Sequence, residues 1–170
     1  GDRTFIGDPN PDYTFGFTNN FTYKNWYMDV LVTASQGNDI YNASRFELEM
    51  MDDHKNQSTR VLDRWMNPGD ITNVPKANAA NAKISSDRFI EDGSFVKLKS
   101  VTLGYNFIKP IKGISKLNVY VTGQNLYTWT KYSGYDPEVN TWANNGLTPG
   151  IDWGAYPSAI SVVFGANITF

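Results

Sequence analysis

The chain has 170 residues, of which 41% are hydrophobic and 15% aromatic, enough for one domain with a substantial core rather than a disordered tail. Its formal net charge of −2 and its scattered Lys and Arg residues exclude a basic nucleic-acid footprint, and the absence of cysteine excludes disulfides and thiolate zinc sites. No run of 18 apolar residues is present, which excludes a transmembrane helix but not transmembrane strands.

The first predicted element is a β-hairpin. It follows an opening stretch that is typical of a loop entered midway, so we expect a fragment of a longer protein. In YTFGFTNNFTY and WYMDVLVTAS, apolar and polar residues alternate, as in strands with one apolar face. A two-residue turn brings both apolar sets to the same side, whereas a slip of one residue would place apolar opposite polar residues. The predicted register pairs Tyr23 with Trp26, Phe21 with Met28, Phe17 with Val32 and Phe15 with Ala34.

Three more strands follow the same alternation. FVKLKSVTLGYNF predicts a strand over 95–107, KLNVYVTGQNLYTW predicts one over 116–129, and SVVFGANITF predicts one over the last ten residues. A turn over 108–115, which contains a proline and a glycine, joins the first two of these strands.

The connections are short at one end of the predicted strands and long at the other. Residues 37–94 and 130–158 form long loops, and loops of this length usually carry function. Within the first, YNASRFELEMM predicts a helix over 41–51, and STRVLDRW predicts another over 58–65 with a cap at its first or second residue. The expected fold is therefore all-β, with antiparallel up-and-down strands and short helices in the long loops.

The strand lengths and the aromatic residues predict the wall of a transmembrane β-barrel. A lipid band about 25 Å tall needs about five outward side chains from a tilted strand, and the stretch from Trp26 to Ala34 supplies them. Lys97 and Lys99 share the parity of the apolar residues in their strand and are expected above the band, near lipid headgroups, or else facing the loop of another strand. Because five strands cannot close a barrel, further strands must come from residues outside this chain. The side chains predicted to face the membrane or to form its aromatic girdles are Phe15, Phe17, Tyr23, Trp26, Tyr127, Trp129 and Phe164.

Four separated blocks of the sequence carry a family resemblance. They are GDPNPDYTFGFTNNFTYKNWYMDVLV, SSDRFIEDGSFVKLKSVTLGYNF, LNVYVTGQNLYTWTKYSGYDPEVN and the closing FGANITF. In this order they resemble the C-terminal end of SusC/RagA-like TonB-dependent outer-membrane transporters over nearly the whole chain. The resemblance implies that residues 1–170 are the C-terminal portion of a barrel of about 22 strands. The plug and the earlier strands would lie outside this chain, and the loops 37–94 and 130–158 would be extracellular.

The same resemblance implies an activity and partners. The whole transporter would import oligosaccharides, or in some members peptides, across the bacterial outer membrane with energy transmitted by TonB. Its partners would be the remainder of the transporter chain, a SusD-like surface lipoprotein over the long loops, the TonB complex acting through the absent N-terminal part, outer-membrane lipid and the substrate. The resemblance implies no enzyme activity and no cofactor, and nucleic acid is not an expected partner.

Two groups of aromatic and apolar residues are predicted to act in assembly or binding. An alternating strand that ends on an aromatic residue looks like the signal by which the outer-membrane assembly machinery recognises the last strand of a barrel, and the predicted signal residues are Phe164, Ile168 and Phe170. The alternative is that Phe170 fills a soluble core. Rings in the second long loop could stack on sugars or on a partner protein, or could pack the loop against its neighbours. These rings belong to Tyr132, Tyr135, Trp142, Trp153 and Tyr156.

The sequence offers only weak candidates for metal binding or catalysis. Asp136 and Glu138 flank a proline and could bind a cation, but carboxylates in this setting are more often turn formers, so no metal site is predicted. His54 is the only histidine, which makes it a poor zinc ligand or catalytic base. Two alternatives to the importer stay open: a secreted β-sandwich carbohydrate-binding module, and an unrelated porin-like barrel.

Overall fold

The chain folds into two compact units. The computed structural model describes residues 3–52, 54–78, 85–138 and 149–170. Residues 11–37, 93–131 and 157–170 form what we call the sheet unit, and residues 1–10, 38–92 and 132–156 form what we call the loop unit. The two long loops predicted from the sequence thus supply most of a unit that has contacts of its own.

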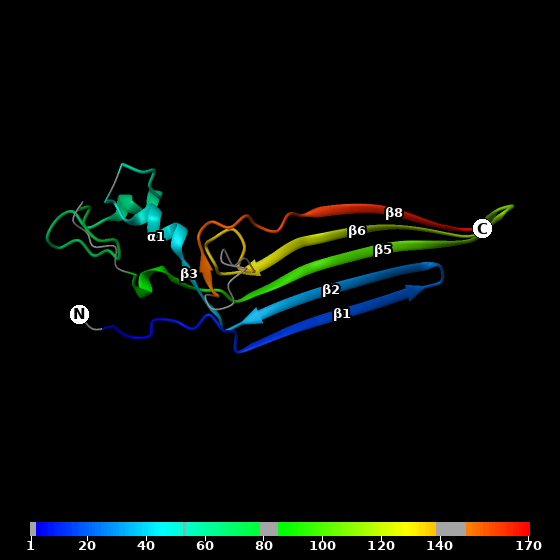
Figure 1. The fold of residues 1–170 in the computed structure, drawn as a ribbon, viewed down its shortest axis with the longest axis horizontal. Helices are drawn as coiled ribbons and strands as arrows, with labels where there is room; N and C mark the ends of the chain where they lie inside the picture. The colour runs from blue at the N-terminus through cyan, green and yellow to red at the C-terminus, as the bar shows by residue number, and fades with distance from the viewer. Residues whose placement is uncertain (1–2, 53, 79–84, 139–148) are drawn as a thin grey trace. The chain divides into compact units, whose positions relative to one another are not determined.

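The sheet unit is one five-stranded antiparallel sheet. Its strands are β1 (Tyr13–Tyr23), β2 (Trp26–Gln36), β5 (Phe95–Ile111), β6 (Ile114–Thr130) and β8 (Ser161–Thr169). They lie side by side in the order β1-β2-β5-β6-β8 (Figure 1). All five predicted strands are therefore confirmed, and each strand pairs with the one before it along this order, as in an up-and-down sheet.

The predicted register of the first hairpin is confirmed pair for pair. Tyr23 lies opposite Trp26 and Phe15 lies opposite Ala34 across the β1–β2 ladder. Lys24, the first residue of the turn, has φ of 55°. A left-handed conformation at this position matches the right-handed twist of the strands that the turn joins. The strict alternation together with a two-residue turn sets this register, since a slip of one residue would place apolar residues opposite polar ones.

The turn predicted over 108–115 is much shorter in the structure. β5 and β6 run on until only Lys112 and Gly113 connect them, and Gly113 has φ of 94°, which a glycine adopts without strain. Pro110 therefore lies inside β5, at a point where the register of the β5–β6 ladder shifts between Ile108 and Ile111. A proline has no N–H to donate to the ladder, and such a shift is where a strand tolerates it.

A bulge in β5 reverses the expected facing of one lysine. The ladder between β2 and β5 shifts between Leu31 and Val32, which leaves Lys99 as an extra residue in β5. On the N-terminal side of the bulge, Val96 and Leu98 therefore lie on the face of the sheet where a strict alternation places Lys97. Lys97 is only 1% exposed, so the prediction that it extends toward lipid headgroups was wrong.

The loop unit contains a small mixed sheet and short helical turns. Its elements are β3 (Asp39–Asn42), α1 (Ala43–Glu49), η1 (Thr59–Asp63), η2 (Asp87–Phe89), β4 (Ile90–Asp92) and β7 (Ile151–Asp152), and the sheet order is β4-β3-β7. β3 pairs antiparallel with β4 and parallel with β7. Phe46, Met50 and Phe89 form its buried cluster, with the rings of Phe46 and Phe89 edge to face at 5.2 Å.

Both predicted helices are present but shorter than expected. Asn42 caps α1 by accepting a hydrogen bond from the backbone N–H of Arg45 at 2.9 Å, and Met51, with φ of 53°, lies just beyond its end. The second prediction corresponds to η1, which is a 3₁₀ helix capped by the Ser58 side chain. None of the helices in the described ranges is long and apolar enough to cross a membrane.

A cross-strand tyrosine covers a glycine of β5 and yields a stability prediction. A Cβ built on Gly104 would lie 2.2 Å from Cζ of Tyr27, whose hydroxyl hydrogen-bonds the Asn118 amide at 3.1 Å. We expect Gly104→Ala to displace this ring and break the bond, at a cost of about 1–3 kcal/mol in the free energy of unfolding. Urea titration of the intact protein measures this cost. The matched control is Gly16→Ala, where a Cβ meets nothing within 4 Å; equal losses for the two variants would refute the ring-over-glycine argument.

Candidate functional site

One face of the sheet unit is apolar from end to end. The ladders align the apolar residues of neighbouring strands into rows that run across the sheet. The row next to the β1–β2 turn consists of Tyr23, Trp26, Tyr105, Val119 and Ala166, and a shorter row of Phe107, Leu117 and Ile168 lies beyond it, toward the β5–β6 turn. The row at the opposite end consists of Phe15, Ala34, Val96 and Trp129. We call this surface the apolar face.

The aromatic residues predicted to face the membrane are all exposed. Phe15, Phe17, Tyr23, Trp26, Tyr127, Trp129 and Phe164 each leave between 47% and 80% of their surface accessible. Rings gather toward both ends of the face: Trp26 stacks edge to face on Tyr105 at 4.8 Å, and Tyr127 does so on Trp129 at 4.8 Å. Exposed rings on this scale are typical of a surface that another apolar phase or partner covers.

The apolar face is hollowed near its turn end. A groove of about 600 Å³ lies among residues that include Trp26, Tyr105, Phe107, Val119 and Phe164. These side chains come from β2, β5, β6 and β8, so the groove spans most of the sheet. Its walls are almost entirely hydrocarbon and aromatic, which suits an apolar chain better than a polar ligand.

The opposite face of the sheet carries hydrogen-bonded polar side chains. Asn118, near the short-turn end of this face, donates to Asn106 Oδ1 at 3.1 Å in addition to its bond with Tyr27. The hydroxyls of Thr102 and Thr122 are 2.8 Å apart across the β5–β6 ladder. The sheet therefore has one face of hydrocarbon and rings and one of amides and hydroxyls.

The residues predicted as an assembly signal are exposed. Phe164 and Ile168 lie on β8, and Phe170 follows its last residue with 87% of its surface accessible. Within the described residues, Phe170 is not covered as a core residue would be. A role of these three residues in assembly stays a prediction.

The loop aromatics separate into one buried and three exposed rings. Tyr132 is 6% exposed, and its hydroxyl donates to Asp152 Oδ2 at 2.6 Å, so this ring packs the loop rather than offering a surface. Tyr135, Trp153 and Tyr156 are exposed and stay candidates for contact with a ligand or partner. Trp142 lies outside the described residues.

An arginine–glutamate cluster, which sequence reasoning missed, holds the loop unit together. It consists of Arg45, Glu49, Arg88 and Glu91. Glu49 is 1% exposed and accepts from Nε of Arg45 at 2.7 Å and from Nη2 of Arg88. The Arg45 Nη1 atom also contacts Glu91 Oε1 at 3.2 Å, so one guanidinium bridges two carboxylates. The cluster joins α1 to residues about 40 positions later in the chain, a spacing that no local pattern reveals.

Glu91 extends this cluster to the second long loop. Its carboxylate accepts from the backbone N–H and the hydroxyl of Ser133, each at 2.8 Å. Although burial opposes ionisation, these bonds and the Arg45 guanidinium lower the pKa of Glu91 below its ordinary value. A hollow of about 290 Å³ lies beside the cluster, and its lining includes Arg45, Arg60 and Tyr135.

The weak metal candidates are placed as turn formers. Asp136 is buried and accepts from the backbone N–H of Glu138 at 3.1 Å, the bond of an Asx turn. Across the described residues, no group of three His, Cys, Asp or Glu side chains is arranged to hold a metal ion. His54 is exposed.

The buried tyrosine gives a pH prediction for the loop unit. Burial, and then the hydrogen bond and charge of Asp152, raise the pKa of Tyr132 far above its ordinary value of 10.0. The unfolded tyrosine ionises near pH 10 and the folded one does not, so this contribution to stability is complete below pH 10 and is lost as the pH rises further. We expect proteolysis of residues 132–138 and 149–156 to accelerate as the pH rises above about 10.

Two variants isolate this effect. Tyr132→Phe should remove the part of the acceleration that comes from ionisation of the tyrosine. At neutral pH it should lower the free energy of unfolding of the loop unit by only about 1 kcal/mol, because Asp152 still accepts hydrogen bonds from the backbone N–H groups of Gly154 and Ala155. Tyr135→Phe, at an exposed ring, should behave like the unmodified protein. Pulse proteolysis read by mass spectrometry measures both, and an identical pH response in the two variants would contradict the assignment to Tyr132.

The known proteins that we compare with this chain by sequence are TonB-dependent receptors. No protein-family model matches the chain. It is 36% identical over 176 residues to the TonB-dependent receptor P3 of Formosa agariphila, covering 99% of this chain and 17% of that receptor. It is 29% identical over 178 residues to the TonB-dependent receptor SusC of Bacteroides thetaiotaomicron, covering 100% of this chain and 16% of that receptor.

A solved structure shares the fold. The RagAB peptide importer in its "closed-closed" state matches with a TM-score of 0.81 at 24% identity, over 98% of this chain and 18% of that chain. The chain spans about 17% of the length of the receptor P3. The relatives named here are receptors and an importer rather than enzymes. The chain therefore belongs to the SusC/RagA-like TonB-dependent receptors of the outer membrane, of which it is one part.

Proposed function

We propose that this chain is the C-terminal wall of the transmembrane barrel of an active importer, with the apolar face against lipid and the polar face toward the lumen. The observation that carries the proposal is the two-sided sheet: rings such as Phe17 and Phe164 are exposed on one face, and a network centred on Asn118 covers the other. A sheet with one hydrocarbon face and one wet face is the pattern of a barrel wall.

The two edges of the sheet support a larger barrel. In the described residues, β1 pairs only with β2, and β8 pairs only with β6. Unpaired backbone N–H and C=O groups are costly in lipid, so the remainder of the receptor chain would supply the neighbouring strands. This argument also disfavours a secreted sandwich module, whose rings would be covered by a second sheet.

The loop unit would lie outside the cell and meet a SusD-like lipoprotein. Exposed rings at Tyr135, Trp153 and Tyr156 suit a protein partner or a sugar face. RagAB is a peptide importer, and the family resemblance also implies transporters of oligosaccharides. The whole receptor would therefore import peptides or oligosaccharides with energy transmitted by TonB.

Two measurements on the full-length receptor test this function. First, the purified receptor should stay monodisperse only in detergent or lipid, and a receptor that remains monodisperse in plain buffer would overturn the membrane wall. Second, cells that lack the receptor or TonB should lose uptake of a fluorescent maltoheptaose or of a fluorescent hexapeptide. Unchanged uptake of both probes would overturn import of these two classes.

A further inference from the structure

The turn end of the sheet unit is strongly basic. We define the turn end as residues 21–28, 103–121 and 164–170, which include the two short turns and the strand ends that adjoin them. These residues contain four lysines and no aspartate or glutamate, although the whole chain has a net charge of −2. The four lysines are Lys24, Lys109, Lys112 and Lys116, and all are exposed.

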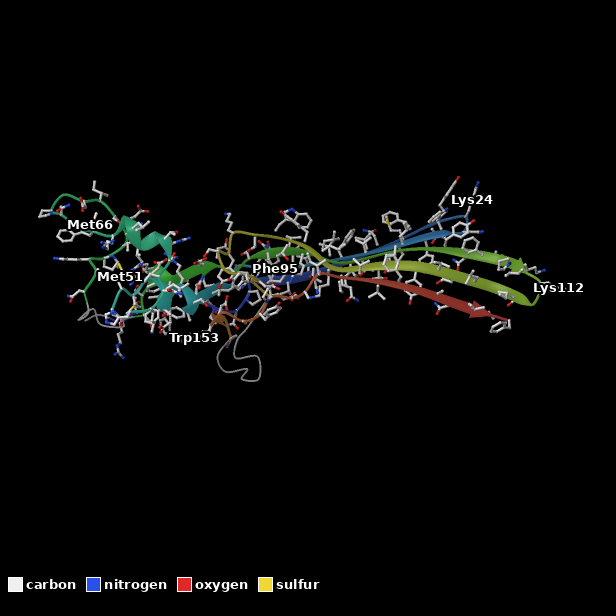
Figure 2. The ribbon with its side chains drawn as sticks, turned by 90° about the horizontal axis from the view of Figure 1, so that it is seen from above. Lys24, Met51, Met66, Phe95, Lys112 and Trp153 are labelled. Carbon is white, nitrogen blue, oxygen red and sulfur yellow. The ribbon has the colours of Figure 1, made fainter. Side chains whose placement is uncertain are left out.

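The fold brings these cations together from two separate turns. Lys24 begins the β1–β2 turn and Lys112 begins the β5–β6 turn, and Figure 2 shows both at the same end of the sheet. The backbone N–H of Asn106 donates to the carbonyl of Asn25 at 2.9 Å, which ties the first turn to β5. Lys109 follows Asn106 by three residues along β5, which corresponds to about 10 Å at the usual rise per residue of a strand.

The lysines border a hollowed part of the apolar face. Nζ of Lys24 lies 5.4 Å from the centre of the Tyr23 ring, which belongs to that face. A second hollow, of about 430 Å³, has Lys109, Lys112 and Phe170 in its lining. The groove of about 600 Å³ reaches Phe107 of β5, two residues before Lys109 in the chain. Cations therefore lie beside an apolar groove, an arrangement that matches the two parts of a charged lipid.

We propose that the turn end binds an anionic glycerophospholipid, with an acyl chain in the groove beside Trp26 and the phosphate against the lysines. This inference rests on the proposed function, because it needs the apolar face to lie in a bilayer. Lysines near a membrane surface attract acidic lipids, and each adds roughly a factor of five in affinity. Short turns of outer-membrane barrels lie on the periplasmic side, which favours a phospholipid over a lipopolysaccharide phosphate.

Quenching of Trp26 by brominated lipids tests the proposal. The full-length receptor and its Trp26→Phe variant are reconstituted into vesicles of phosphatidylcholine and phosphatidylglycerol, with bromine on the acyl chains of one lipid at a time. The difference between the two proteins gives the fluorescence of Trp26. We expect quenching by brominated phosphatidylglycerol to correspond to a local fraction of this lipid around Trp26 that is at least about five times its fraction in the bulk bilayer.

Charge-neutralising variants assign the enrichment to the lysines. The triple variant Lys24→Gln, Lys109→Gln and Lys112→Gln should bring the local lipid ratio to the bulk ratio, and about 0.5 M salt should act in the same direction. The matched control is Lys55→Gln, Lys76→Gln and Lys131→Gln, which removes the same charge elsewhere in the chain and should leave the enrichment unchanged.

The outcomes separate this inference from the proposed function. Equal quenching by both brominated lipids in the unmodified receptor would overturn the anionic-lipid site while leaving the membrane wall intact. Loss of enrichment in the control triple variant as well would overturn the assignment to the turn end. No quenching by either lipid would mean that Trp26 does not contact acyl chains, and it would overturn the membrane wall itself. Enrichment of added lipopolysaccharide in place of phosphatidylglycerol would overturn the choice of lipid.

Discussion

Replacing Glu49 by glutamine is expected to destabilise the loop unit by about 3–5 kcal/mol. The carboxylate is 1% exposed and receives charged hydrogen bonds from Arg45 and Arg88. Removing one charge from a buried ion pair leaves the other charges without compensation, which costs more than the pair itself contributes. Hydrogen exchange of residues 43–49 and 87–92, measured by mass spectrometry on the full-length receptor, reports the free energy of opening.

The same helix supplies the control. Glu47 pairs with Lys55 at 2.8 Å, but both side chains are partly exposed, so Glu47→Gln should cost at most about 1 kcal/mol. The account of the arginine–glutamate cluster predicts a clear separation between the two variants. Similar exchange rates in both would show that the buried carboxylate does not hold the loop unit together.

Placing an arginine at Val162 is expected to cost about 2–4 kcal/mol in the folding of the receptor into a bilayer. Val162 is the second residue of β8 and pairs with Gly123 of β6, in the row of the apolar face that also holds Val30 and Val101, midway between the two ends of that face. A charged side chain on the lipid face of a barrel is penalised most near the centre of the bilayer. Urea titration of folding into lipid vesicles measures the difference.

Val163 provides a matched comparison one residue away. It is the same residue type and is also exposed, but it belongs to the opposite face, where it pairs with Thr122. Val163→Arg should cost much less, since water in the lumen solvates the guanidinium. A soluble protein with two wet faces would tolerate both arginines equally, so equal small costs would contradict the membrane-wall account.

The sequence predicted the sheet well where the alternation is unbroken and poorly where one residue interrupts it. The β1–β2 register followed from the two-residue turn that pairs Tyr23 with Trp26, and a slip of one residue would have mixed the two faces. In β5 the extra residue Lys99 changes the parity, which the sequence does show: Val96 and Leu98 are out of step with Val101. A strict period of two therefore misplaced Lys97.

The loop unit was predicted least well because long-range contacts shape it. Glu49 and Arg88 are 39 residues apart, and Tyr132 finds Asp152 across 20 residues. Neither pairing leaves a local pattern, so the small sheet was missed, and the sequence left open whether Tyr132 packs the loop or offers a surface. The cap of α1 by Asn42 is local, and the pattern did reveal a helix there.

Site-directed spin labelling along β8 tests the central claim most directly. Single cysteines at 162, 163, 164, 167 and 168 are introduced one at a time into the full-length receptor in vesicles, since the segment itself has none. The account predicts collision with oxygen, which concentrates in lipid, at 162, 164 and 168, and collision with a water-soluble nickel chelate at 163 and 167. Strong collision with the chelate at all five positions would show that water, not lipid, covers the apolar face.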